Sequence, residues 1–141
     1  MNHATKTYKI VFPIHPRSRK SLENHGLSHQ IESNEKIILT PPLDYFAFQR
    51  LTATCKFVLT DSGGIQEETT FRQVPCLTLR PNTERPSTID VGTNSLVPFE
   101  TNVVTSYIDQ ITNGTYKQGV VPELWDGKAT ERIVKILSDI L

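Results

Sequence analysis

The segment from Val58 to Glu68 constrains the fold more than any other part of the chain. Its sequence is VLTDSGGIQEE, in which a short apolar run leads into a turn of small residues and then into helix-forming residues. Asp61 and Ser62 are residue types that commonly cap a helix, and Gly63 leaves no side chain between the backbone and an approaching group. The segment therefore predicts a buried strand, a tight turn and the start of a helix.

This turn is suited to binding an anion. The first N–H groups of a helix have no partner within the helix, and the helix dipole adds about half a positive charge there. Phosphate is a common ligand at such a position. Glu67 and Glu68 lie one turn further on, where a carboxylate could accept hydrogen bonds from sugar hydroxyls. The same residues also suit an ordinary capped turn, and the segment alone leaves both interpretations open.

Strands and helices are predicted to alternate along the rest of the chain. The expected strands are Tyr8–His15, Ile37–Thr40, Lys56–Thr60, Pro75–Leu79 and Asn94–Val97. The expected helices are Arg17–His25, a helix capped by Asp44 and running to Thr54, Gly63–Arg72, Thr101–Thr112 and Ala129–Leu141, with a helical turn from Pro86 to Val91. Apolar strands joined by helices are typical of a parallel sheet buried on both faces. We expect an α/β fold: a Rossmann-like, open parallel sheet of about five strands with flanking helices.

The last two expected helices carry apolar stripes. In Thr101–Thr112 the stripe comprises Val103, Val104, Tyr107, Ile108 and Ile111, and in Ala129–Leu141 it comprises Ile133, Ile136, Leu137 and Ile140. Such spacing predicts one inward face on each helix. Asn113-Gly114-Thr115 fits a glycosylation sequon, but we interpret it as a helix-ending turn.

Composition excludes several classes of function. The chain has 141 residues, a length that suits one domain, with 15 basic and 15 acidic residues. This balance argues against a nucleic-acid partner or a polybasic membrane surface. No apolar run approaches a membrane span, and the polar start Met1–Lys6 lacks the apolar region of a signal peptide, so we expect a cytoplasmic protein. Cys55 and Cys76 are too far apart for a metal motif and are predicted to be buried, reduced thiols.

Three polar segments follow three of the expected strands. They are His15, the Asp61–Gly63 turn and the run from Arg80 to Arg85. Ligands of open parallel sheets bind at the carboxyl ends of the strands. The pattern therefore predicts that these segments lie at one binding edge.

Five motifs occur in an order that resembles the non-hydrolysing UDP-N-acetylglucosamine 2-epimerases. They are FPIHPR from Phe12, PLDY from Pro42, DSGGIQEE from Asp61, LR followed by TERP from Leu79, and GTN from Gly92. Their order and spacing match that family from about Lys9 to Leu141. The resemblance implies the C-terminal half of a two-domain, GT-B-like sugar-nucleotide epimerase. The implied reaction interconverts UDP-N-acetylglucosamine and UDP-N-acetylmannosamine by elimination and re-addition of UDP, without a cofactor.

The resemblance also implies roles for individual residues. Ser62 and Gly63 would hold the diphosphate, with Arg85 beside it. Glu68 rather than Glu67 would bind the ribose, and Phe48 would pack near the uracil. His15 would lie near the reacting sugar as the catalytic candidate. Each role has a structural alternative. Phe48 has core spacing, His15 could be structural, Arg85 could pair with Glu84, and Glu67 could be solvated or paired with Arg72.

The chain departs from the family pattern at its start. The domain that carries the family's acid–base carboxylates has no counterpart here. The family's strand with a histidine-arginine-arginine-glutamate motif, which should precede Tyr8, has no counterpart either. We therefore expect residues 1–141 to form a single, incomplete UDP-binding domain, inactive alone, that a separate N-terminal half would complete. Exposed edges of an incomplete sheet promote association, so a homodimer is expected. Alternatives are a fragment of a related glycosyltransferase, a UDP-sugar-binding module without catalysis, and a remnant without function.

Overall fold

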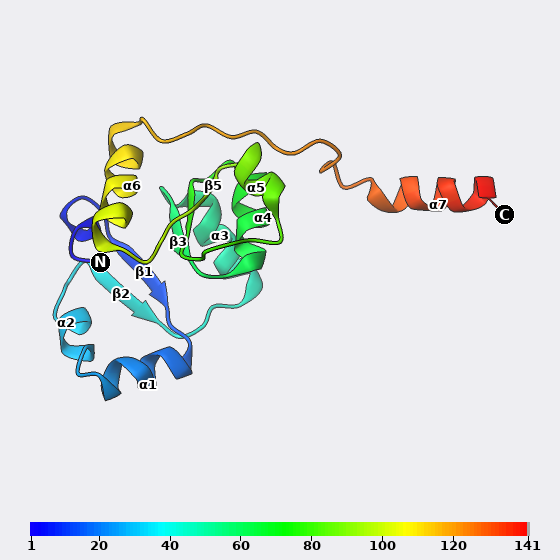
Figure 1. The fold of residues 1–141 in the computed structure, drawn as a ribbon. Coiled ribbons are helices and arrows are strands. Elements are labelled where there is room, and N and C mark those ends of the chain that lie inside the picture. Colours follow the sequence, from blue (N-terminus) through cyan, green and yellow to red (C-terminus); the bar gives the residue numbers. More distant parts are fainter. Residues whose placement is uncertain (141) are drawn as a thin grey trace. The chain divides into compact units, whose positions relative to one another are not determined.

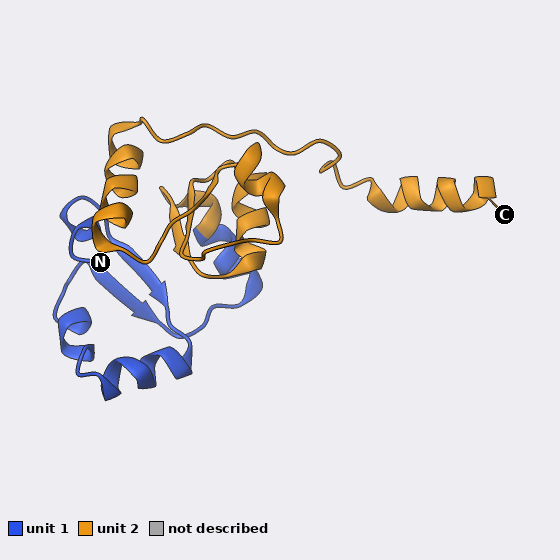
Figure 2. Cartoon of the chain, in the orientation of Figure 1, with its two compact units in different colours: residues 1–51 blue, residues 52–141 orange. Residues whose placement is uncertain are grey.

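The computed structural model describes residues 1–140, and the chain divides into two compact units (Figure 2). The first unit covers residues 1–51 and the second covers residues 52–141. The prediction of a single domain over residues 1–141 stays a prediction. No helix in residues 1–140 combines the length and the apolar character needed to cross a membrane.

The first unit contains one pair of parallel strands (Figure 1). Strands β1 (Ile10–Pro13) and β2 (Ile37–Thr40) run in register, with Ile10 opposite Ile37 and Pro13 opposite Thr40. The unit also contains the 3-10 helix η1 (Ala4–Lys6), α1 (Pro16–Asn24), α2 (Ser28–Glu32) and the first part of α3 (Tyr45–Thr54). Pro16 occupies the first turn of α1, where its missing N–H group is no loss.

The second unit contains a three-stranded parallel sheet in the order β3-β4-β5. The strands are β3 (Val58–Thr60), β4 (Cys76–Thr78) and β5 (Asn94–Leu96), and the helices are α4 (Gly63–Phe71), α5 (Pro86–Asp90), α6 (Thr101–Asn113) and α7 (Ala129–Ile140). Helices α4 and α5 connect successive strands, as parallel pairing requires. Gly114 ends α6 with a left-handed backbone (φ 73°), which confirms the helix-ending turn predicted there.

The interior of the second unit is unusually polar. Cys76, Leu77 and Val97 are fully buried apolar residues of the strand region. Six polar residues are equally buried: Gln66, Thr69, Thr70, Thr78, Thr88 and Asn94. Hydrogen bonds made by the Asn94 side chain join it to three of the others, namely Gln66, Thr78 and Thr88.

The predicted α/β class is confirmed, with five strands that are all parallel. One detail differs, because the strands form two sheets of two and three strands rather than one open sheet. Helices η1 and α2 were not predicted. Both are short, and the five residues of α2 include a single apolar residue, so no periodic pattern announces them.

The last helix corrects a prediction about burial. The helix exists over Ala129–Ile140, and Leu141 lies outside the described residues. Its stripe of Ile133, Ile136, Leu137 and Ile140 was expected to face inward, yet these side chains are between 53% and 75% exposed. The amphipathic pattern is present, but within residues 1–140 nothing covers it. In α6, by contrast, Ile108 and Ile111 are buried as predicted.

Candidate functional site

Helix α4 begins directly above the carboxyl end of β3. Ser62 is its N-cap residue and has an extended backbone, but its side chain makes no capping hydrogen bond. The Ser62 N–H group donates instead to the Thr60 hydroxyl at 3.0 Å. The N–H groups of the first helical turn, starting at Gly63, therefore have neither an intrahelical partner nor the Ser62 side chain. This is the geometry of an anion-binding helix terminus.

Two arginine side chains approach this helix terminus. A Cβ atom added at Gly63 would lie 2.8 Å from Nη1 of Arg85 and 3.6 Å from Nη1 of Arg80. Only glycine leaves room for a guanidinium group this close to the backbone. The structure thus brings together Ser62, Gly63 and Arg85, as the sequence predicted, and adds Arg80, to which the sequence analysis assigned no ligand role.

Acidic side chains neutralise part of this positive charge. Arg85 Nε donates to Glu67 Oε2 at 2.8 Å, and Arg85 Nη1 lies 3.5 Å from Glu84 Oε2. Arg80 Nη1 lies 3.8 Å from the same Glu84 oxygen. The hydrogen bond to Glu67 is the main cause of the raised pKa of Arg85. The sequence indicated that Arg85 could pair with Glu84. The shorter contact of Arg85 with Glu67 was not predicted.

Glu68, the predicted ribose ligand, lies on α4 one turn after Gly64 and is half-buried. Its neighbour Glu67 is exposed and bound to Arg85. The two adjacent carboxylates therefore differ in burial, and Glu67 forms an ion pair with Arg85 at 2.8 Å. The assignment of Glu68 to the ribose stays a prediction.

A hydrogen-bonded group of four side chains, three of them buried and one half-buried, adjoins the Arg85 backbone. It consists of Gln66 on α4, Thr83 in the loop before α5, Thr88 on α5 and Asn94 on β5, and we call it the threonine–amide cluster. Sequence reasoning missed these residues, although Thr83 and Asn94 belong to the TERP and GTN motifs. A polar residue that begins a buried strand, as Asn94 does, was a usable signal for a required hydrogen bond.

His15 and Phe48 belong to the first unit. His15 is the exposed N-cap residue of α1, and its Nδ1 accepts a hydrogen bond from the Arg17 N–H group at 3.2 Å. This contact gives His15 a structural role that does not depend on any ligand. Phe48 is a half-buried residue of α3. Their predicted placement beside the substrate stays a prediction.

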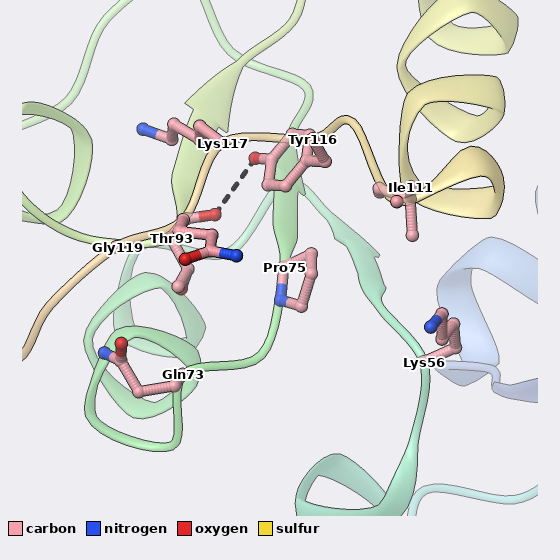
Figure 3. A pocket seen from close by; sticks show the side chains of 10 residues that line it. Lys56, Gln73, Pro75, Thr93, Ile111, Tyr116, Lys117 and Gly119 are labelled. Atoms are coloured by element: carbon pink, nitrogen blue, oxygen red, sulfur yellow. Dashed lines mark hydrogen bonds between the residues drawn. The ribbon is translucent and has the colours of Figure 1, made fainter.

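A cavity lies at the opposite edge of the three-stranded sheet. The cavity, of about 380 Å³, lies where the strands begin, and Lys56, Pro75 and Thr93 precede or adjoin their amino ends (Figure 3). The Tyr116 hydroxyl donates to the Thr93 carbonyl at 2.9 Å, and the Lys117 ammonium group donates to the Ile89 carbonyl at 2.7 Å. Partial burial lowers the pKa of Lys117. These internal hydrogen bonds join backbone segments at the edge away from α4.

The two cysteines take no part in the candidate site. Both are free; Cys76 is buried and Cys55 is half-buried. Burial raises the pKa of each thiol, which keeps both protonated at neutral pH. The prediction of a buried thiol is confirmed for Cys76, whereas Cys55 is only half-buried. Among residues 1–140, no group of three or more His, Cys, Asp or Glu side chains could hold a metal ion.

A parallel α/β unit with a glycine turn, a free helix terminus and arginines at the strand ends is typical of nucleotide-binding proteins. The sequence model of the family described as UDP-N-acetylglucosamine 2-epimerase matches residues 1–138. The chain belongs to this family, whose members are isomerases. The family resemblance seen in the five motifs is therefore confirmed.

Individual relatives agree with the family assignment. The UDP-N-acetylglucosamine 2-epimerase of Methanocaldococcus jannaschii is 41% identical over 129 residues, which cover 92% of this chain and 35% of that protein. The crystal structure of that enzyme in complex with UDP-GlcNAc and UDP superposes with a TM-score of 0.77 at 40% identity, covering 92% of this chain and 35% of that one. The Neisseria meningitidis enzyme bound to UDP-GlcNAc gives a TM-score of 0.71 at 27% identity, covering 99% of this chain and 41% of that one.

The chain thus spans about a third of the length of the curated relatives that it matches. The expected GT-B-like likeness is borne out, because the structural neighbours are UDP-N-acetylglucosamine 2-epimerases.

Proposed function

We propose that this chain is the C-terminal, UDP-binding portion of a UDP-N-acetylglucosamine 2-epimerase. The observation that carries the proposal is the arrangement at the start of α4, where Arg85 lies against Gly63 and the first-turn N–H groups are free of a side-chain cap. A nucleoside diphosphate supplies the anionic oxygens that such a site attracts. Relatives crystallised with UDP-GlcNAc and UDP belong to the same family.

Each site residue has a role that its chemistry supports. The N–H groups that follow Ser62 and begin at Gly63 donate to the diphosphate, and Arg85 supplies a positive charge beside it. Glu68 accepts hydrogen bonds from the ribose hydroxyls. His15 lies near the reacting sugar and Phe48 near the uracil. UDP and UDP-N-acetylglucosamine are the ligands, and no cofactor takes part.

Epimerisation requires more than this chain supplies. A proton must leave C2 of the sugar on one face and return on the other, which needs positioned acid–base groups on both faces. Glu68 is committed to the ribose in this proposal, so an N-terminal half of the kind present in the longer family members supplies the acid–base carboxylates. Apolar strand residues remain exposed in both units, namely Val11, Ile38 and Leu59, and they provide surface for that half or for a second copy in a homodimer.

Calorimetric titration with UDP tests the anion site. We expect UDP to bind the purified chain, and we expect Ser62→Asp to weaken binding by roughly tenfold or more, because a carboxylate would repel the diphosphate. Ser106→Asp, on the exposed side of α6, adds the same charge elsewhere and serves as the control. Equal affinity of Ser62→Asp and the unmodified chain would remove the diphosphate assignment.

A further inference from the structure

The threonine–amide cluster is connected by hydrogen bonds between side chains. Thr83 Oγ1 donates to Gln66 Oε1 at 2.7 Å, and Asn94 Nδ2 donates to the same oxygen at 3.0 Å. Asn94 Nδ2 also donates to Thr88 Oγ1 at 3.1 Å, while Asn94 Oδ1 accepts from Thr78 Oγ1 at 2.6 Å. Strand β4, strand β5, helix α4 and helix α5 are thereby joined through one buried set of polar groups.

The two threonines hold the backbone of Arg85 from both sides. The Arg85 N–H group donates to Thr83 Oγ1 at 3.1 Å. The Arg85 carbonyl accepts from Thr88 Oγ1 at 2.8 Å and from the Thr88 N–H group at 3.1 Å. Arg85 has φ −124° and ψ 62°, outside the regular helix and strand regions, so these contacts define its conformation. That conformation places its guanidinium group against Gly63.

Stability alone does not favour glutamine at the centre of this cluster. Gln66 is fully buried, and its amide nitrogen has no hydrogen-bond partner among the described residues. A buried donor without a partner is unfavourable, whereas an apolar side chain of similar shape would avoid the penalty. The benefit of Gln66 therefore lies in its oxygen, which accepts from Thr83 and Asn94 together.

We propose that the threonine–amide cluster is a set of positioning residues that act on the ligand through Arg85. The cluster fixes both peptide groups of Arg85 and so holds its guanidinium group over the amino end of α4. The choice of a diphosphate as ligand rests on the proposed function, while the positioning of Arg85 does not. None of the four cluster residues needs to touch the ligand.

Thr83 provides the sharpest test, because it is half-buried in a loop and its hydroxyl both donates and accepts. In titrations with UDP, Thr83→Val is expected to weaken binding roughly three- to tenfold, the range expected for a lost hydrogen bond. Thr83→Ser keeps the hydroxyl and is expected to restore the original affinity. Thr105→Val, which removes a hydroxyl from α6, is the matched control and is expected to bind UDP normally.

A double-mutant cycle separates positioning from a general structural role. If Thr83 acts through Arg85, then Thr83→Val causes no further loss of UDP affinity in an Arg85→Ala background. Full additivity, or equal losses in Thr83→Val and Thr83→Ser, would overturn the proposal. Melting temperatures of all variants show that the compared chains are folded.

A second readout tests the positioning without any ligand. The Arg85 Nε–H group donates to Glu67 and gives its own signal in a nitrogen–proton NMR spectrum. We expect Thr83→Val to shift this signal and to accelerate its exchange with water, and we expect Thr83→Ser to leave both unchanged. An unmodified chain that fails to bind UDP would refute the proposed function, and the Arg85 signal would still decide the positioning. An unaltered signal in Thr83→Val would refute the positioning itself.

Discussion

Arg85 lies against Gly63 so closely that one added methyl group must displace it. The methyl group of Gly63→Ala would sit 2.8 Å from Arg85 Nη1, the flexible end of a side chain that can move away. The substitution should therefore have little effect on folding, while it moves a charge that the proposed site needs. A substitution at Gly63 is thus expected to change ligand affinity without lowering the stability of the fold.

Gly63→Ala is expected to weaken UDP binding roughly three- to tenfold, because the arginine loses its place beside the diphosphate. Its melting temperature should stay equal or rise, since alanine favours a helix over glycine by roughly 0.5–1 kcal/mol. Gly64→Ala is the matched control, because its methyl group meets no protein atom within 4 Å. Calorimetry and thermal unfolding measure the two effects. Equal losses of affinity in both variants would contradict displacement of Arg85 as the cause.

The adjacent carboxylates of α4 are expected to differ in their effect on ribose recognition. A carboxylate that accepts from ribose hydroxyls makes charge-assisted hydrogen bonds. We expect the unmodified chain to prefer UDP over 2′-deoxy-UDP, and Glu68→Ala to lose most of that preference. Glu67→Ala removes a solvent-exposed ion pair with Arg85, which contributes little to stability, and should retain the preference. The opposite result in competition titrations would assign the ribose to Glu67.

At the scale of elements, the three-stranded sheet is tied together at both ends. The threonine–amide cluster joins the elements at the carboxyl ends of the strands. At the amino ends, the Tyr116 hydroxyl lies 2.9 Å from the Thr93 carbonyl, 3.2 Å from the Cys76 carbonyl and 2.8 Å from Ser95 Oγ. Tyr116 therefore connects the segment after α6 to β4 and β5.

Tyr116 predicts a pH dependence of stability. Burial is the main cause that raises the pKa of Tyr116 to about 12 from an ordinary value of 10.0. Between these values the unfolded chain loses the tyrosine proton while the folded chain keeps it. The contribution is therefore fully present below about pH 10 and is lost as the pH rises toward about 12. The loss is at most about 3 kcal/mol.

Urea unfolding of the unmodified chain and of Tyr116→Phe measures this effect. Phenylalanine lacks the titrating group, so the difference in unfolding free energy between the two proteins should shrink as the pH rises above about 10. The subtraction cancels the lysine titrations that both chains share. A difference that stays constant up to about pH 12 would show that Tyr116 ionises as it does in the unfolded chain.

At the scale of the whole molecule, the chain spans about a third of its relatives' length. The proposed UDP site needs acid–base groups from an N-terminal half. We predict no detectable epimerisation by the purified chain, because absent acid–base groups each cost on the order of 10²–10⁴ in rate. UDP binding is expected to remain. Nuclear magnetic resonance of the sugar distinguishes UDP-N-acetylmannosamine from the substrate.

Mixing experiments complete this prediction. Addition of the N-terminal portion of a family member is expected to produce turnover, and the full-length Methanocaldococcus jannaschii enzyme is the positive control. Turnover by the chain alone would contradict the proposal that an N-terminal half supplies the acid–base groups. UDP binding without turnover in the mixture would favour a binding module.

The parts of the fold that local sequence specifies were predictable. The strand and glycine turn around Ser62 and Gly63, the helical turn that begins at Pro86 and the helix end at Gly114 all depend on interactions within a few residues. Capping preferences, the fixed φ of proline and the freedom of glycine act over that range. Apolar runs likewise indicated five parallel strands, although not their division into two sheets.

What the sequence by itself determined is therefore the order of the strands and of the longer helices, the α/β class and the position of the glycine turn. Only the tertiary structure decided that Arg85 binds Glu67, that Gln66 and Asn94 share one buried cluster with two threonines, and that the apolar stripe of α7 is exposed. These features join residues that are 18 and 28 positions apart, or depend on a surface that covers a helix. Periodicity indicates which face of an element is apolar, but hydrogen bonds and burial depend on what lies opposite that face in space.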